Sequence, residues 1–226
     1  MSGKTHLSVA AAYDAWAATY DSYDNPMVFA ASRALATDGA SVGGKDCLEF
    51  GCGTGRNLAA FLGAGAREVV GFDASAAMLA QAHKTCPQAR LFQADMQADV
   101  PLNTASFDHI LFCLTLEHVG DLVAPLRAAR RVARPLATIR IVEIHPFISL
   151  QGIAAHFRTE AGEDITMPTF SHRFADFLGA FQAAGLMVQH VREWVGRDFG
   201  PDAPHKITRR GADWPWLVDW TLTPRG

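Results

Sequence analysis

The sequence predicts an α/β protein built around a doubly wound, mostly parallel sheet. Short apolar runs, each typical of a buried strand, alternate with helical patterns between residues 46 and 144. The first of these runs, residues 47–50, is followed at once by three closely spaced glycines and a helical pattern over 56–62. Strands that alternate with helices through short connections form parallel βαβ units, which set this fold class.

The glycine turn is the first candidate binding element. Gly51, Gly53 and Gly55 have no Cβ atom and tolerate positive φ, so the backbone N–H groups of this unit can approach a ligand closely. The N-terminus of the helix that follows adds partial positive charge. Glu49, at the end of the strand, would repel a phosphate, so we expect a cationic or hydroxyl-rich ligand. A structural βα turn with an incidental acid is the alternative.

Two further acids follow the next two predicted strands. The run over 68–72 ends at Asp73, and the run over 89–93 is followed by Asp95 and Met96. The carboxyl ends of parallel strands line the crevice where ligands bind, and a carboxylate at the Asp73 position typically binds a ribose diol. The apolar side chain of Met96 could cover a flat ring.

Two more strands, each with a neighbouring helix, complete the parallel part of the predicted sheet. We expect strands over 107–114 and 136–144, and helices over 74–84 and 121–134. The run over 107–114 is almost entirely apolar, as is typical of a parallel strand that is buried on both faces.

Residues 1–40 are expected to form a helical cap of two short helices, broken at Asn25–Pro26. Proline is tolerated at the first position of a helix, because the N–H group there has no partner within the helix. Core packing is the simple explanation of the aromatic residues in this cap, but hydroxyl groups at the outside of a sheet are also placed to reach a ligand. These aromatic residues recur at spacings of three and four: Tyr13, Trp16, Tyr20 and Tyr23.

The pattern changes after residue 146. Residues 146–180 are interpreted as a lid insertion that binds the acceptor, with a short helix over 149–157 and a polar turn over 159–166. A helix over 173–184 ends at a glycine, as many helices do. We expect two last, antiparallel strands over 186–195 and 216–223, joined by a long loop.

Length and composition bound the function. A chain of 226 residues fits one domain, 1–226, with a substantial core. The net charge of −3 gives no basic surface for nucleic acid. No apolar run reaches the length of a membrane span, and no signal peptide is visible, so we expect a cytoplasmic protein without a membrane partner. The four cysteines are widely spaced and are expected to be buried free thiols: Cys47, Cys52, Cys86 and Cys113.

Taken in order, the motifs resemble those of the class I S-adenosylmethionine-dependent methyltransferases, specifically the group that acts on small molecules. The resemblance covers roughly residues 10–145 and implies a Rossmann-like, doubly wound, mostly parallel seven-stranded sheet with an antiparallel C-terminal strand and a helical lid insertion. One departure is Pro135-Leu-Ala-Thr138, where the family often carries Pro-Gly-Gly. The matching segments are 13–21, 48–55, 70–79, 94–96 and 107–119.

The resemblance also implies roles for individual residues towards the cofactor, S-adenosyl-L-methionine. The turn from Gly51 through Cys52 and Gly53 to Gly55 would wrap the methionine moiety above Glu49. Asp73 and the adjoining Ala74 would lie at the ribose, and Asp95 would accept from the adenine amino group. The remaining implied cofactor contacts are Met78, Met96 and Leu114 at the adenine, and Tyr13 or Tyr20 at the methionine carboxylate.

Histidine is the candidate general base, since its pKa lies near neutral pH. His118 is the first choice, because it follows the fourth strand on the loop nearest the expected methyl group; His145 and His172 are the other candidates. A hydrogen-bonded structural role is the alternative for each. We expect no metal, because the spacing of these histidines fits no dedicated ligand motif.

The acceptor is expected to be a small, apolar, ring-containing metabolite that is methylated on O or N. Its apolar character is indicated by Met167 and by the phenylalanines of and after the insertion: Phe170, Phe174, Phe177 and Phe181. Core packing explains Phe177 and Phe181 at least as well.

Two other functions share parts of the pattern. A nicotinamide-dependent oxidoreductase would use the same strand–turn–helix unit, but Arg56 occupies the position of its third fingerprint glycine and Glu49 would face a pyrophosphate. A protein that keeps the cofactor pocket but catalyses a non-methylating reaction, or only binds, is the second alternative, because the acceptor pocket can diverge independently.

Overall fold

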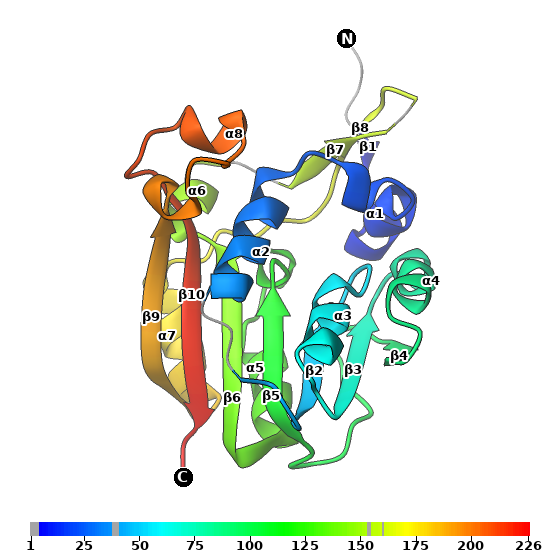
Figure 1. Ribbon diagram of the computed structural model, residues 1–226, viewed down its shortest axis with the longest axis vertical. Helices are drawn as coiled ribbons and strands as arrows, with labels where there is room; N and C mark the ends of the chain where they lie inside the picture. Colours follow the sequence, from blue (N-terminus) through cyan, green and yellow to red (C-terminus); the bar gives the residue numbers. More distant parts are fainter. Residues whose placement is uncertain (1–4, 38–40, 153–154, 160) are drawn as a thin grey trace.

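The computed structural model describes residues 5–37, 41–152, 155–159 and 161–226. Its main sheet has seven strands in the order β4-β3-β2-β5-β6-β10-β9 (Figure 1). The first five are parallel, and β10 is antiparallel to both β6 and β9, as the sequence predicts. The strands are β2 (Asp46–Phe50), β3 (Glu68–Asp73), β4 (Arg90–Gln93), β5 (Phe107–Cys113), β6 (Ala133–Ile144), β9 (Leu186–Val195) and β10 (Pro215–Pro224).

Helices cover both faces of the sheet (Figure 1). Successive residues of a strand point to opposite faces, so Ile110 of β5 packs in one apolar cluster and Leu111 in another. The Ile110 face is covered by α5 (Val123–Val132) and α7 (Phe174–Ala183). The other face is covered by α2 (Pro26–Thr37) and α3 (Arg56–Gly63), while α4 (Ala76–Thr85) connects β3 with β4. No helix within the described ranges is both long enough and apolar enough to cross a membrane.

The N-terminal part is helical, but its aromatic residues do not share one helix. Helix α1 (Val9–Trp16) is followed by the 3₁₀ turn η1 (Tyr20–Ser22), and α2 begins at Pro26 as predicted. The aromatic residues form a cluster nonetheless, with the Trp16 ring centroid 4.9 Å from that of Tyr20. Residues 38–40, at the end of the predicted cap, lie outside the described residues.

The insertion differs from the prediction. The expected helix over 149–157 is wrong: α6 (Pro146–Ser149) is a single turn, and residues 156–158 form strand β7 (His156–Arg158). The expected polar turn contains strand β8 (Asp164–Thr166), which pairs with β7. Residues 153–154 and 160 lie outside the described part of the chain. The loop expected between the last two strands contains the 3₁₀ turn η3 (Gly196–Phe199) and the short helix α8 (His205–Thr208).

A second, three-stranded sheet joins the insertion to the N-terminus. Strand β1 (Thr5–His6) pairs in parallel with β8, which gives the order β1-β8-β7 (Figure 1). The Phe157 ring of β7 stacks on the Trp16 ring of α1, with centroids 4.5 Å apart and planes 5° apart. Ala12, Trp16, Phe157, Ile165 and Met167 therefore form a small apolar cluster separate from the main core. We call α1, η1 and this three-stranded sheet the cap.

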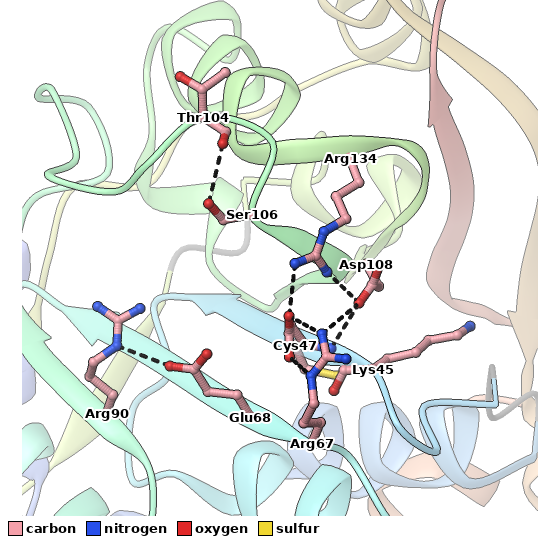
Figure 2. Close-up of polar contacts among 10 residues, drawn as sticks. Lys45, Cys47, Arg67, Glu68, Arg90, Thr104, Ser106, Asp108 and Arg134 are labelled. Atoms are coloured by element: carbon pink, nitrogen blue, oxygen red, sulfur yellow. Dashed lines mark hydrogen bonds and ion pairs between the residues drawn. The ribbon is translucent and has the colours of Figure 1, made fainter.

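Ion pairs connect the amino-terminal ends of the neighbouring strands β3, β2, β5 and β6 (Figure 2). Glu49 and Asp73 lie at the opposite, carboxyl-terminal ends of β2 and β3. Arg67, immediately before β3, donates two hydrogen bonds to Asp46 of β2. Arg134 of β6 donates to Asp46 at 2.9 Å and to Asp108 of β5 at 2.5 Å. The Arg67 hydrogen bonds hold the pKa of the Asp46 carboxyl below its usual value, and Arg134 acts in the same direction. We call Asp46, Arg67, Asp108 and Arg134 the clasp.

Candidate cofactor and acceptor site

A cavity of about 440 Å³ lies at the carboxyl ends of the parallel strands, beneath the cap. The predicted residues that line it are Tyr13, Tyr20, Gly51, Gly53, Asp73, Ala74, Met78, Asp95, Met96, Leu114 and His118. Residues that the sequence did not single out complete its wall: Ser8, Val9, Ala10, Phe72, Ala94, Gln97, Cys113, Thr115, Val119 and Pro168. Phe170, from the insertion, also lines it. The structure thus brings one candidate histidine together with most of the candidate cofactor residues.

The glycine turn shapes one wall of the cavity. Gly51 has φ of +69°, and a Cβ atom there would lie 2.6 Å from Cγ2 of Thr115, so glycine allows the loop after β5 to approach the turn. Gly53 has φ of +51° but open space where a Cβ would point. Its N–H group donates to Oδ2 of Asp73 at 2.9 Å, which ties the turn to the end of β3.

Asp73 is held by the backbone on two sides. Its Oδ1 accepts from the N–H of Ser75 at 2.9 Å, while its Oδ2 accepts from Gly53. Burial is the largest influence on this carboxyl and raises its pKa, although the backbone donors oppose that shift. Each carboxylate oxygen keeps a further lone pair, so Asp73 can still accept from a pair of ligand hydroxyls. Asp95 is more exposed, with Oδ1 accepting from the N–H of Gln97.

Glu49, Cys52 and Gly55 lie behind the cavity wall rather than on it. Glu49 is 1% exposed, and its Oε1 accepts from Nδ2 of Asn57 at 2.6 Å. Its Oε2 has no partner among the described residues, and burial raises the pKa of this carboxyl to about 8. Gly55 begins α3 where that helix packs on Ala82 of α4.

Two acids of the N-terminal segment, missed by the sequence reasoning, fasten it over the cavity. Asp14 accepts hydrogen bonds from the Ser75 hydroxyl at 2.6 Å and from the Ala77 N–H at 3.0 Å. Asp21 accepts from the Thr54 hydroxyl at 3.0 Å. The sequence held a signal for these two acids, because each directly follows a tyrosine that was a cofactor candidate. Both tyrosines line the cavity. The cap is thereby connected to the start of α4 and to the glycine turn.

His118 is enclosed by hydrogen bonds on both ring nitrogens. Nδ1 lies 2.8 Å from the carbonyl oxygen of Pro168, which can only accept, so Nδ1 carries the proton. Nε2 therefore accepts from the Tyr13 hydroxyl, at 2.9 Å. Burial lowers the pKa of His118 and raises the pKa of Tyr13 well above its ordinary value. The pair is thus a neutral imidazole and a protonated phenol.

The other two candidate histidines lie outside the cavity. His145 caps α6, with Nδ1 accepting from the Phe147 N–H at 3.1 Å, while Nε2 lies 2.7 Å from Oε1 of Glu193. His172 lines a separate, more open hollow between α5 and α7, and its Nε2 donates to the Val119 carbonyl at 2.7 Å. Both are placed as structural, hydrogen-bonded histidines.

Among the apolar residues proposed to contact the acceptor, some line the cavity and others lie outside it. Phe177 and Phe181 pack in the main core with Trp220. Met167 is buried in the cap cluster. Among the phenylalanines proposed for the acceptor, Phe170 lines the cavity, and it is 42% exposed.

The loop after β5, residues 114–118, is held in an unusual conformation by a buried acid. Leu114 has φ of +56°, which is rare for a residue other than glycine and is concentrated at functional sites. Oε1 of Glu143, at the end of β6, accepts from the N–H groups of Thr115 and Leu116, each at 2.9 Å. Burial raises the pKa of Glu143 to about 8. No group of three potential metal ligands occurs within the described ranges.

Comparison with known protein families finds a match to the central part of the chain. Residues 47–136 match the family model of a methyltransferase domain. No curated protein sequence matches the chain at a significant level.

Many solved structures share the fold. An S-adenosylmethionine-dependent methyltransferase from Mesorhizobium loti is 22% identical, with a TM-score of 0.71 over 86% of this chain and 97% of that one. The DhpI–SAH complex is 22% identical, with a TM-score of 0.68 over 96% and 95% of the two chains. The [4+2]-cyclase SpnF is 17% identical, with a TM-score of 0.63 over the whole of both. At these identities the likeness concerns the fold.

Proposed function

We propose that the chain, whose residues 47–136 match the family model of a methyltransferase domain, is a class I S-adenosylmethionine-dependent methyltransferase that transfers a methyl group from S-adenosyl-L-methionine to a small-molecule acceptor. The observation that carries this proposal is the convergence of the glycine turn, Asp73 and Asp95 on one cavity beneath the cap. The proposed acceptor is a small, apolar, ring-containing metabolite that is methylated on O or N.

The residues of the cavity fit the cofactor. Asp73 offers its free lone pairs to the ribose hydroxyls, and the apolar side chains of Phe72, Met78 and Met96 provide surfaces for the adenine ring. The turn at Gly51–Gly53 lies where the methionine moiety would be held. The unpartnered Oε2 of Glu49 provides a buried acceptor behind that turn.

The sulfonium of the cofactor supplies an activated methyl group and a neutral leaving group. The task of the protein is therefore to hold the acceptor in line with the methyl carbon, which can contribute about 7–11 kcal/mol towards the barrier. The cap supplies one wall of this cavity, since Tyr13 and Tyr20 line it and hydrogen bonds of Asp14 and Asp21 hold their segment in place.

The walls of the cavity favour an acceptor without negative charge. Val119, Pro168 and Phe170 give it an apolar side next to His118. No lysine or arginine of the described chain lines it, whereas Asp73 and Asp95 do. An anionic acceptor would therefore lose hydration without gaining an ionic partner.

A second candidate is a protein that binds the cofactor but catalyses a different reaction. It is favoured by one observation: the cyclase SpnF matches the chain from end to end in fold. Binding of S-adenosyl-L-methionine is common to both candidates, so methyl transfer distinguishes them.

Calorimetry followed by a transfer assay tests the proposal. We expect S-adenosyl-L-methionine and S-adenosylhomocysteine to bind and NAD not to bind, because Asp73 and Asp95 line the cavity and no lysine or arginine of the described residues lines it to neutralise a pyrophosphate. Radiolabel from methyl-labelled S-adenosyl-L-methionine should then appear in a neutral ring-containing acceptor from a panel of phenols, anilines and indoles. Binding of NAD in place of S-adenosylhomocysteine would contradict the cofactor assignment. Cofactor binding without transfer to any member would favour the second candidate.

A further inference from the structure

The hollow between α5 and α7 adjoins the cavity beneath the cap, and one side chain lines both. That side chain is Phe170. The two spaces also meet at consecutive residues, since Val119 lines the cavity and Gly120 lines the hollow. His172 of the hollow donates from Nε2 to the carbonyl oxygen of Val119 at 2.7 Å. The hollow, with a volume of about 540 Å³, is therefore an immediate neighbour of the cavity.

The volume of the cavity limits the acceptor that can lie wholly inside it. The cavity measures about 440 Å³. Sites for a single drug-sized ligand span about 300–1,000 Å³, and the proposed cofactor is by itself a ligand of that size. With the cofactor bound, the cavity can hold the methylated group of the acceptor but little more. An acceptor with a further substituent must therefore extend into a neighbouring space.

The ring of Phe170 is placed to contact an acceptor that extends from one space into the other. Its backbone is fixed, because its N–H donates at 2.7 Å to the carbonyl oxygen of Glu117 in the 3₁₀ turn η2 (Leu116–His118). The ring lies against Gly120, where a Cβ atom would be 3.2 Å from Cε1 of Phe170. Gly120 does not have positive φ, so what the glycine provides is space for this ring. Phe170 remains 42% exposed, which leaves part of its surface for a ligand.

The polar groups of the hollow accept hydrogen bonds. His172 donates through Nε2, so Nδ1 is an acceptor in the neutral ring. Asp121 accepts through Oδ1 from the Val123 N–H at 2.9 Å, at the start of α5. Asp176 accepts through Oδ2 from the Arg173 N–H at 2.7 Å, at the start of α7. Each carboxylate keeps a second oxygen, and no lysine or arginine of the described chain lines the hollow. Such groups suit a hydrogen-bond donor and repel an anion.

We propose that the hollow is a second subsite for the methyl acceptor, which binds an amino or hydroxyl substituent of the acceptor while Phe170 contacts its ring between the two spaces. This inference rests on the methyl transfer proposed above. It narrows the acceptor from an apolar ring to a ring that carries a side arm ending in a hydrogen-bond donor.

Gly179 allows the hollow to be filled without a clash. It lines the hollow from α7, and a Cβ atom there would meet nothing within 4 Å. Leucine favours a helix more than glycine does, so G179L should fold and place an apolar side chain in the hollow. A183L is the matched control, because Ala183 is an exposed residue one turn further along α7 that does not line the hollow.

Calorimetry on the protein saturated with S-adenosylhomocysteine compares three phenols that differ in their side arm. Tyramine carries an amine, 4-propylphenol has an apolar arm of the same length, and 4-hydroxyphenylacetate carries a carboxylate. We expect the wild type to bind tyramine at least about tenfold more tightly than either of the others, because a charged donor gains hydrogen bonds in the hollow. G179L should remove this preference and A183L should keep it, with the affinity for S-adenosylhomocysteine unchanged in both.

Three results would overturn the subsite. They are a wild type that does not prefer tyramine, a G179L variant that keeps the preference, and an A183L variant that loses it as completely as G179L does. In each case S-adenosylhomocysteine still binds, so the proposed function stands without the subsite. A wild type that does not bind S-adenosylhomocysteine would instead contradict the proposed function.

Discussion

At the scale of single residues, two glycines of the same turn differ in the space that a side chain would have. Gly51 and Gly53 both have positive φ, but a Cβ atom meets Thr115 only at Gly51. We expect G53A to cost about 1–2 kcal/mol of unfolding free energy from backbone strain alone, and G51A to cost more, because it also displaces the loop that carries Leu114 and His118. Urea denaturation measures both, and calorimetry with S-adenosylhomocysteine measures the effect on the cavity.

G53A is the matched control for G51A, since both substitutions add the same methyl group in the same turn. The expected order is a larger loss of S-adenosylhomocysteine affinity for G51A than for G53A. Equal losses of stability and affinity would contradict the importance of the Gly51–Thr115 approach.

The residues around the cavity could be predicted where topology alone brings them together. Asp73 and Asp95 end neighbouring parallel strands, so their meeting at one edge follows from the order of strands. The hydrogen bonds of His118 could not be predicted from the sequence, because both of its partners, Tyr13 and Pro168, are distant from it along the chain.

At the scale of elements, Glu143 holds the loop after β5 in place. E143A should leave the N–H groups of Thr115 and Leu116 without a partner, which costs about 1–3 kcal/mol for each buried group and should lower both stability and S-adenosylhomocysteine affinity. E143Q keeps an acceptor oxygen in the same position and should retain most of both. Urea denaturation and calorimetry on the two variants provide the measurement.

The comparison between the two variants also separates charge from hydrogen bonding. Burial raises the pKa of Glu143 to about 8, so a neutral amide resembles the form that is favoured near neutral pH. A loss of affinity in E143Q as large as that in E143A would show that the negative charge, and not the acceptor oxygen, is what the loop requires.

Most of the main sheet could be predicted because most of its strands contain a short apolar run with a clear break after it, such as residues 69–72 of β3 and 110–113 of β5. The second sheet could not. Its strands span two or three residues each, too short for a periodic pattern, and β7 alternates between polar His156 and Arg158 around a single buried Phe157. The Phe157 ring stacks on the ring of Trp16, which is distant in sequence, so the pattern over 149–157 does not reveal this contact.

At the scale of the whole molecule, the clasp makes the free energy of unfolding depend on pH in the acidic range. Asp46 has a lowered pKa in the folded state, chiefly through its hydrogen bonds from Arg67. Its contribution is therefore complete above the pKa of an unfolded aspartate and is lost as pH falls through the lower, folded value. We expect the gap in unfolding free energy between wild type and D46N to narrow from about pH 6 to about pH 3, as urea denaturation would show.

D99N is the control for this acid effect. Asp99 is 98% exposed in its side chain and pairs with Arg131 at 3.6 Å, so its contribution should be small at any pH. A gap between wild type and D46N that stays constant across the range would mean that Asp46 acts through packing and not through its charge.

The pairing of β1 with β8 has a consequence for how the protein is made. Thr5 leaves the ribosome well before its partner Ile165, because a long stretch of the chain separates the two residues. Until then the N-terminal segment can reach the glycine turn and α4 but lacks the strand that anchors it. Contacts so distant in sequence form slowly, because a long loop must close first. The cofactor cavity is therefore completed late. A nascent chain that ends before residue 164 contains the parallel strands but lacks β8, and so cannot complete the cap.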